Sequence, residues 1–192
     1  MRKKNNWIEA EKFLSTDKHI GPLIKKWGHC TIVPIKKPLY FEDLVDAICS
    51  QQLSGKAAKT IFERVKKLLI KITPKNVLTI DEQKLRDCGL SWQKVSYIKD
   101  LATKVVGGDL NLSILDKLSD EEVRNKLVAV KGIGNWTAEM FLMFSLARPD
   151  IFPKDDLGIQ KAMKNLKIKN SNRWKPYRTI ASWYLWRSLE NR

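Results

Sequence analysis

Apolar residues recur every three or four positions along most of the sequence, which is the spacing of one face of an α-helix. Clear examples begin after Phe41-Glu42-Asp43 and extend over 58–69 and 94–105. Glycine and proline interrupt the pattern at short intervals, so short connections are expected. The sequence therefore predicts eight to ten short helices in an all-α architecture.

Two local signals add detail to this pattern. Ser119 and Glu122 stand three residues apart before an apolar run, which is the pattern of a capping box and predicts a helix that begins there. Thr31–Ile35 is rich in β-branched residues and predicts one short strand, although Pro34 weakens it because proline lacks the N–H that a sheet needs.

Composition narrows the class of protein. The 192 residues are 43% hydrophobic, enough to bury a core without disulfides. No apolar run reaches the roughly 20 residues of a membrane span, and the N-terminal sequence lacks the apolar core of a signal peptide. We therefore expect no membrane partner and a cytoplasmic location, associated with the nucleoid if the source is prokaryotic.

The cysteines and histidines give no sign of a metal site. Cys30, Cys49 and Cys88 are odd in number and lack a C-x-x-C pair, so a disulfide framework, a zinc site and an iron–sulfur cluster are not expected. Free thiols in a reducing compartment are the prediction. His19 and His29 lack ligand spacing, and we expect structural roles for both.

The charge is strongly positive and unevenly spread. Lys and Arg number 36 against 21 acidic residues, a net +15 that indicates a polyanionic partner. Residues 161–192 carry nine bases and one acid, with Trp and Tyr between them, whereas 119–160 carry seven acids and five bases. Aromatic residues among bases suit the stacking of nucleobases. The alternative is a solvated basic tail.

The sharpest motif is the Gly132-Ile133-Gly134 turn, which lies between two helical patterns. Glycines leave backbone N–H groups uncovered, and together with the start of the next helix these groups can hold a phosphate. The alternative is an ordinary helix–helix turn. About twenty residues later, the adjacent carboxylates Asp155 and Asp156 precede another helix. On spacing alone, either of them suits a helix N-cap.

Several segments in order give a resemblance to a known family. Val130–Ala138, Phe152–Ile159 and Trp174–Arg178, preceded by Ile48–Ser54 and Leu85–Ser91, resemble the helix-hairpin-helix/Gly-Pro-Asp (HhH-GPD) DNA glycosylases, and within them the AlkA-like 3-methyladenine DNA glycosylase II branch. The resemblance runs from Phe41 to the C-terminus. It implies two helical subdomains that flank a DNA cleft, with 41–148 as one and 1–40 plus 149–192 as the other.

The resemblance also assigns chemistry to the carboxylates and aromatics. It places Asp156 at the catalytic position, where one carboxylate stabilises the positive charge that develops on the sugar and orients a water. Asp155 lies beside it and can cap the helix. The implied pocket for the flipped base is formed by Trp136, Trp186, Met140 and Asp155, and indole faces favour a cationic alkylated base.

Further positions are implied to contact DNA or an ion. Gln52 aligns best with the wedge that fills the vacated duplex position, followed by Leu53. Backbone carbonyls of Val128, Val130 and Ile133 match the family's monovalent-cation site, which can hold Na⁺ or K⁺. No other cofactor is expected. The implied phosphate contacts are Gly132, Gly134, Lys131, Thr137, Lys161, Lys175 and Arg178.

These implications lead to one main hypothesis and two alternatives. Family members with lyase activity carry a lysine where this chain has Trp136, so the resemblance implies a monofunctional glycosylase for alkylated purines. Its partner would be double-stranded DNA with damaged bases, bound by a monomer. The alternatives are a glycosylase for oxidised or deaminated bases, and a non-catalytic DNA-binding module in which the aspartates only cap a helix.

Overall fold

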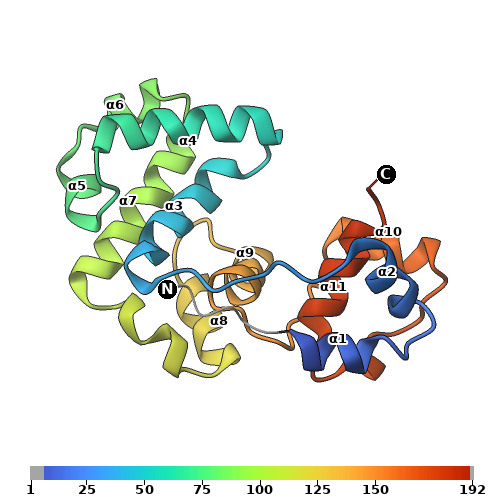
Figure 1. The fold of residues 1–192 in the computed structure, drawn as a ribbon. Coiled ribbons are helices and arrows are strands. Elements are labelled where there is room, and N and C mark those ends of the chain that lie inside the picture. Colours follow the sequence, from blue (N-terminus) through green and yellow to red (C-terminus); the bar gives the residue numbers. More distant parts are fainter. Residues whose placement is uncertain (1–6, 191–192) are drawn as a thin grey trace. The chain divides into compact units, whose positions relative to one another are not determined.

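The computed structural model describes residues 7–190 (Figure 1). These residues form eleven α-helices, joined by short connections and brief 3₁₀ or π turns, and they contain no strand. The helix count exceeds the expected eight to ten because several helices are only one or two turns long and carry too few apolar positions to register as periodic. The all-α class is confirmed. No helix in the described range is long and apolar enough to span a membrane.

The expected strand at Thr31–Ile35 is wrong. This segment is extended but has no partner strand, and Pro34 lacks the N–H that a ladder needs (Figure 1). Within it Ile32 is buried, at 5% exposed, whereas Thr31 is exposed and Val33 and Ile35 are half-buried. The Ile32 carbonyl accepts a hydrogen bond from the Trp7 indole N–H at 2.9 Å.

The described helices divide between two compact units. One unit is continuous and extends from Ile35 to Ala138, whereas the other combines the residues up to Pro34 with those from Glu139 onward. Both boundaries fall earlier than the expected residues 41 and 148. The second is earlier because Phe144 and Ala147 pack into the hydrophobic cluster of the discontinuous unit.

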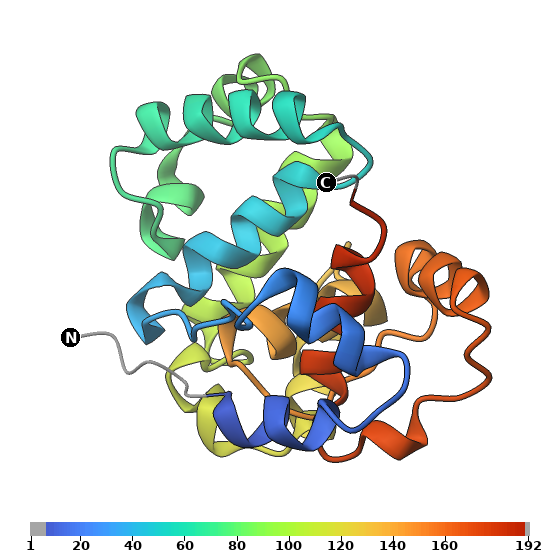
Figure 2. The same cartoon turned by 45° about the vertical axis from the view of Figure 1, so that its right-hand side comes forward.

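The continuous unit is built around two long helices. In it α3 (Tyr40–Ser50) packs against both α4 (Gly55–Leu69) and α7 (Trp92–Gly107), and Figures 1 and 2 show α3 and α7 side by side below α4. The remaining elements of this unit are η1 (Lys37–Leu39), α5 (Pro74–Thr79), α6 (Glu82–Asp87), η2 (Leu112–Lys117), α8 (Asp120–Val128) and the start of α9 (Asn135–Met140).

Helix ends in this unit follow local sequence signals. The capping box before α8 is confirmed: the Ser119 N–H donates to Glu122 at 2.8 Å, and the Glu122 N–H donates to Ser119 Oγ at 3.2 Å. At the start of α7 the Ser91 hydroxyl accepts the Lys94 N–H at 3.2 Å, and Gly108 ends that helix in the left-handed conformation. These caps fix where α7 and α8 begin, and therefore where the turn at 129–134 lies.

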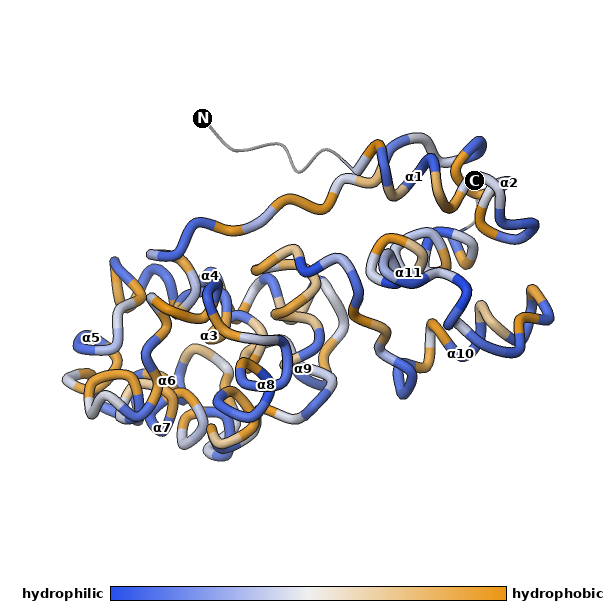
Figure 3. The backbone as a smooth tube through the Cα atoms, turned by 90° about the horizontal axis from the view of Figure 1, so that it is seen from below, coloured by the Kyte–Doolittle hydropathy of each residue, from blue (hydrophilic) through white to orange (hydrophobic). Residues whose placement is uncertain are grey.

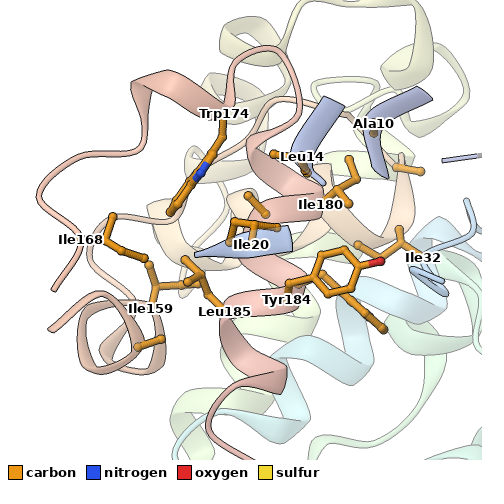
Figure 4. Packing of buried hydrophobic residues seen from close by; sticks show 14 residues of the cluster. Ala10, Leu14, Ile20, Ile32, Ile159, Ile168, Trp174, Ile180, Tyr184 and Leu185 are labelled. Carbon is orange, nitrogen blue, oxygen red and sulfur yellow. The ribbon is translucent and has the colours of Figure 1, made fainter. Parts of the chain in front are cut away.

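The discontinuous unit is centred on α11 (Arg178–Arg187). Around it lie α1 (Ile8–Leu14), α2 (Ile20–Trp27) and α10 (Leu157–Asn165). Figure 4 shows side chains of α11 between residues of the other helices, and Figure 3 shows how apolar and polar stretches alternate along the chain. The unit also contains the π turn η3 (Phe141–Ser145) and η4 (Asn172–Trp174).

Polar contacts connect the two sequence-distant parts of this unit. The buried Glu11 carboxylate accepts hydrogen bonds from the Tyr184 hydroxyl at 3.0 Å and from the Cys30 N–H at 2.6 Å. His29 Nδ1 lies 2.7 Å from the same carboxylate, which agrees with a structural role for this histidine. Helix α1 is therefore fastened to α11.

Candidate active site and DNA-binding hairpin

Asp156 lies at the N-terminus of α10, where its Oδ1 accepts two hydrogen bonds. One comes from the Ile159 N–H at 2.8 Å and makes Asp156 the N-cap, and the other comes from the Trp186 indole N–H at 2.9 Å. Asp155 is exposed. The expectation that Asp155 caps the helix is therefore wrong, because Asp156 performs the capping itself. Its carboxylate is thereby oriented by two helices.

Gly158 allows this close contact between α10 and α11. A Cβ at Gly158 would lie 3.0 Å from Asp156 Oδ1 and 3.0 Å from Trp186 Cδ1. The half-buried Trp186 ring packs on Phe144, with ring centroids 5.9 Å apart. The indole is thus held between a phenyl ring and the carboxylate. The role of Gly158 has no signal in the sequence beyond its place in the Phe152–Ile159 motif.

The segment that leads into Asp156 is attached to the first turn of α11. Arg178 Nε and Nη2 donate to the Asp150 carboxylate at 2.7 and 2.8 Å, and Thr179 Oγ1 accepts from the Ile151 N–H at 2.9 Å. Arg178 was expected to contact phosphate, and the structure gives it an internal partner that the sequence did not indicate. The other two basic candidates of this unit, Lys161 and Lys175, are exposed.

The Gly-Ile-Gly turn joins α8 to α9 in the continuous unit. Gly132 has φ +79°, and a Cβ there would overlap the Tyr97 ring, so only glycine fits. Nothing lies within 4 Å of a Cβ at Gly134, which leaves that position open to a ligand. The exposed Lys131 donates its backbone N–H to Asp100 at 2.8 Å, and Thr137 is buried.

The expected wedge residues lie on a loop that is fastened to this turn. Gln52 and Leu53 are exposed, and Gln52 has φ +56°, a left-handed conformation that is rare outside glycine. The Gln51 side chain donates to the Gly132 carbonyl at 2.8 Å, and Lys94 Nζ donates to the Gln51 carbonyl at 2.7 Å. Sequence reasoning missed the contacts of Gln51 and Lys94, because a polar residue carries no local signal of the distant partner that it meets in the fold.

The glycine turn and the loop that carries Gln52 both line a polar pocket of about 400 Å³. Trp136 lines it and is 49% exposed, which is high for a tryptophan and argues against ordinary core packing. Trp186 belongs to the other unit, as does the half-buried Met140. The pocket is lined by Gln51, Gln52, Ser91, Gln93, Lys94, Tyr97, Gly132, Gly134, Trp136 and Thr137.

Backbone oxygens rather than side chains are the candidate ion ligands. Residues 128–134, which include Val128, Val130 and Ile133, line an open depression of about 490 Å³. The Val130 carbonyl accepts the Ile133 N–H at 3.1 Å, and a carbonyl oxygen has a second lone pair for an ion. Within 7–190, no three His, Cys, Asp or Glu side chains are grouped as a metal site.

The cysteines are free thiols, as the sequence predicts. Burial raises the pKa of Cys30 and of Cys49 to about 12, and it also raises the pKa of Cys88. Because the thiolate is the reactive form, burial lowers the reactivity of these side chains near neutral pH.

Comparison with known proteins identifies the family. The model of the HhH-GPD superfamily of base excision DNA repair proteins matches residues 45–187. The chain belongs to the HhH-GPD superfamily. The family predicted from the glycine turn and the aspartate motif is thus confirmed.

Individual members of the HhH-GPD superfamily resemble the chain closely. It is 37% identical to DNA-3-methyladenine glycosylase 1 of Schizosaccharomyces pombe over 77% of the chain and 72% of that protein. It is 34% identical to the alkylbase DNA glycosidase-like protein mag2 of the same yeast, over 97% and 95%. The S. pombe Mag1 structure in complex with abasic DNA superposes with a TM-score of 0.83, at 35% identity over 94% and 96%.

Proposed function

We propose that this protein is a monofunctional DNA glycosylase. It hydrolyses the N-glycosidic bond of alkylated purines, of the 3-methyladenine and 7-methylguanine type, and leaves an abasic site. The single observation that carries this proposal is the Asp156 carboxylate, held by the Ile159 N–H and the Trp186 indole in a chain whose relatives are named 3-methyladenine glycosylases. A capping role alone would not need the second donor.

Asp156 supplies the electrostatic part of the reaction. As the glycosidic bond breaks, the base takes the bonding electrons and the sugar gains oxocarbenium character. A fixed carboxylate stabilises that positive charge without reorganising, and it can accept a proton from the water that adds to the sugar carbon. An N-alkylated purine is cationic, so it leaves as a neutral base and needs no general acid.

The tryptophans supply recognition of the damaged base. The Trp186 indole adjoins the carboxylate through its N–H, and Trp136 presents an exposed indole on the other unit. Attraction between a cation and an indole face is worth roughly 0.5–2 kcal/mol, and a neutral base gains less. Met140 and Asp155 are further candidate contacts to the base. Attraction of this kind selects charge and shape rather than one hydrogen-bonding pattern.

The partner is double-stranded DNA that contains a damaged base, bound by one copy of the chain. Support comes from the open backbone at Gly134, from the net charge of +15, and from the related Mag1 structure, which is a complex with abasic DNA. Gln52, with Leu53 beside it, is the proposed wedge. Lys131, Thr137, Lys161 and Lys175 are the proposed phosphate contacts.

A monovalent cation and a cytoplasmic location complete the proposal. The carbonyls of Val128, Val130 and Ile133 would hold Na⁺ or K⁺, because hard cations prefer oxygen ligands and these residues line one depression. Such an ion would add positive charge beside the phosphate-binding turn. No other cofactor is proposed, and Asp156 acts without the ion.

Base release from methylated DNA tests the proposed activity. Free 3-methyladenine and 7-methylguanine are separated by chromatography after incubation with the wild-type protein or with Asp156→Asn. Both bases should appear with the wild type, and the variant should bind DNA without releasing them. Activity close to wild type in Asp156→Asn would remove Asp156 from the mechanism. Release of neither base by wild-type protein that binds DNA would favour a non-catalytic module.

Borohydride trapping tests the monofunctional assignment. A lyase forms a Schiff base between a lysine and the sugar, which borohydride reduces to a stable protein–DNA adduct. Because Trp136 stands at the position of that lysine, no adduct is expected. A trapped adduct would instead favour the alternative glycosylase for oxidised or deaminated bases.

A further inference from the structure

Three residues fasten the start of the Asp156 loop to α11. We name Asp150, Arg178 and Thr179 the α11 clamp. The Arg178 guanidinium forms two parallel hydrogen bonds with the Asp150 carboxylate, at 2.7 and 2.8 Å, and a third with the Asp150 carbonyl at 3.1 Å. Planar, bidentate pairing of this kind is strong and directional. Asp150 is thus held in both position and orientation.

Thr179 continues the clamp on both sides of Asp150. Its hydroxyl donates to the Arg148 carbonyl at 2.6 Å and accepts the Ile151 N–H at 2.9 Å. Its own N–H donates to the Pro149 carbonyl at 3.0 Å. Thr179 is completely buried, so these bonds are shielded from water. Backbone groups from 148 to 151 are therefore all tied to one turn of α11.

Only a short, irregular stretch separates the clamp from the carboxylate. Residues 152–155 contain no helix, and the Asp156 N–H donates to the Pro153 carbonyl at 3.0 Å. Proline restricts this backbone, and Pro153 is buried. Only four residues lie between Ile151 and Asp156, so a displacement of 148–151 can shift the carboxylate.

Both ends of the Asp156 loop are held by the same helix. Thr179 lies in the first turn of α11, and Trp186, seven residues later and roughly 10 Å along the axis, donates to Asp156. We propose that the α11 clamp is a positioning device: Arg178 and Thr179 set the loop so that the Asp156 carboxylate meets both the Trp186 indole and the reacting sugar. Arg178 then acts on the reaction through Asp150 rather than by binding phosphate.

The inference rests on the proposed glycosylase activity, and its test separates the two. Arg178→Met keeps the alkyl chain and removes every guanidinium donor. Single-turnover base release at saturating DNA should slow about 10- to 100-fold, because misplacing a catalytic group by about 1 Å costs on the order of 100-fold. The Kd for DNA that contains a non-cleavable abasic analogue should change less than threefold. Arg178→Lys should recover part of the rate.

A second readout does not depend on activity. The indole N–H signal of Trp186, assigned in ¹⁵N–¹H spectra by its loss in Trp186→Phe, reports the hydrogen bond to Asp156. The signal should move upfield in Arg178→Met as that bond lengthens. If wild-type protein releases no alkylated base, the proposed function fails, and this signal still decides whether the clamp positions the loop.

Matched variants complete the design. Arg173→Met removes another arginine–carboxylate pair of the same unit, with Asp17 at 2.9 Å, and should leave the rate at saturating DNA and the Trp186 signal unchanged. If Arg178→Met does not fold, Thr179→Ser and Asp150→Asn test the clamp with smaller changes. An unchanged rate and signal would overturn the inference. So would a higher Kd with a normal rate at saturation, because that result would make Arg178 a phosphate contact.

Discussion

The Trp186 indole N–H donates to Asp156 Oδ1 at 2.9 Å across thirty residues of sequence. The same oxygen accepts the backbone N–H of Ile159. One carboxylate oxygen of the proposed catalytic residue thus accepts hydrogen bonds from two helices. Substitutions can separate the cap, the indole and the carboxylate.

Trp186→Phe should slow base release while DNA binding persists. Phenylalanine keeps an aromatic face on Phe144 but removes the donor, and the loss of one hydrogen bond to a charged group, about 1.5–3 kcal/mol, corresponds to roughly 10- to 100-fold in rate. Single-turnover release at saturating DNA measures the effect. Trp183→Phe on the same helix is the control, because that ring packs on Tyr184 instead. Equal rates for the two variants would contradict the role of the indole N–H.

Substitutions of Asp156 should separate its effect on base release from its effect on the free energy of unfolding. Asparagine still caps a helix, so Asp156→Asn should abolish base release and change the free energy of unfolding by less than about 0.5 kcal/mol. Alanine cannot cap, so Asp156→Ala should also cost about 1 kcal/mol in that free energy. Urea unfolding of the three proteins measures the difference. Equal free energies of unfolding for the alanine and asparagine variants would contradict a stabilising role of Asp156 as the N-cap.

Gly158→Ala should slow base release without loss of the fold. The new Cβ would lie 3.0 Å from both Asp156 Oδ1 and Trp186 Cδ1, so one of the two must move by a few tenths of an ångström. We expect about a tenfold slower release, in line with the sensitivity of catalysis to small displacements. Gly107→Ala is the control, since its Cβ would meet nothing closer than 3.9 Å. A rate as high as that of Gly107→Ala would show that the contact tolerates the methyl group.

Alanine substitutions at the two glycines of the turn should affect different properties, stability at Gly132 and DNA affinity at Gly134. Gly132→Ala places a Cβ inside the Tyr97 ring at a positive φ and should lower the free energy of unfolding by about 2 kcal/mol or more. Gly134→Ala meets no atom within 4 Å, so stability should persist while DNA affinity falls, because the methyl group covers the backbone that a phosphate would approach. Thermal unfolding and a salt titration of DNA binding distinguish them. Weakened folding in Gly134→Ala would contradict this division.

Buried thiols should make stability fall in alkaline solution. Burial raises the pKa of Cys30 and of Cys49 to about 12, whereas an unfolded thiol titrates near 8.5. Above about pH 9 the unfolded chain therefore loses protons that the folded chain keeps, and the free energy of unfolding falls by up to about 1.4 kcal/mol per pH unit for each thiol. Urea unfolding between pH 9 and 10.5 should show a shallower decline in Cys30→Ala/Cys49→Ala. Parallel declines would contradict the prediction.

Features carried by contiguous motifs were predictable from the sequence. The Ser119–Glu122 box and the long helices depend on residues three or four apart, and Asp156 belongs to a motif with a fixed spacing to its neighbours. The family, the all-α class and the free thiols followed from such local patterns and from composition. The capping and helix signals each lie within one helix or one turn, and the family resemblance combines several such segments in order.

Features that depend on distant partners were not predictable. Nothing in the sequence pairs Arg178 with Asp150, and a lone basic residue in a basic region is more simply interpreted as a phosphate contact. The apolar run at Thr31–Ile35 suits a strand or a buried extended segment equally, and only the absence of a partner strand decides. The choice of Asp156 over Asp155 as cap depends on the local backbone, in which the Asp156 N–H donates to the Pro153 carbonyl.

The discontinuous unit also constrains the order in which the chain can fold during synthesis. Ile35–Ala138 is contiguous and can fold as soon as it leaves the ribosome. Helices α1 and α2 are synthesised first but pack against α11. The hydrogen bond between Glu11 and Tyr184 joins residues 173 positions apart. Contacts of such long sequence separation form late. The turn proposed to bind DNA therefore forms before the Asp156 site. A chain that ends before α11 would contain this turn but would lack the Trp186 contact to Asp156.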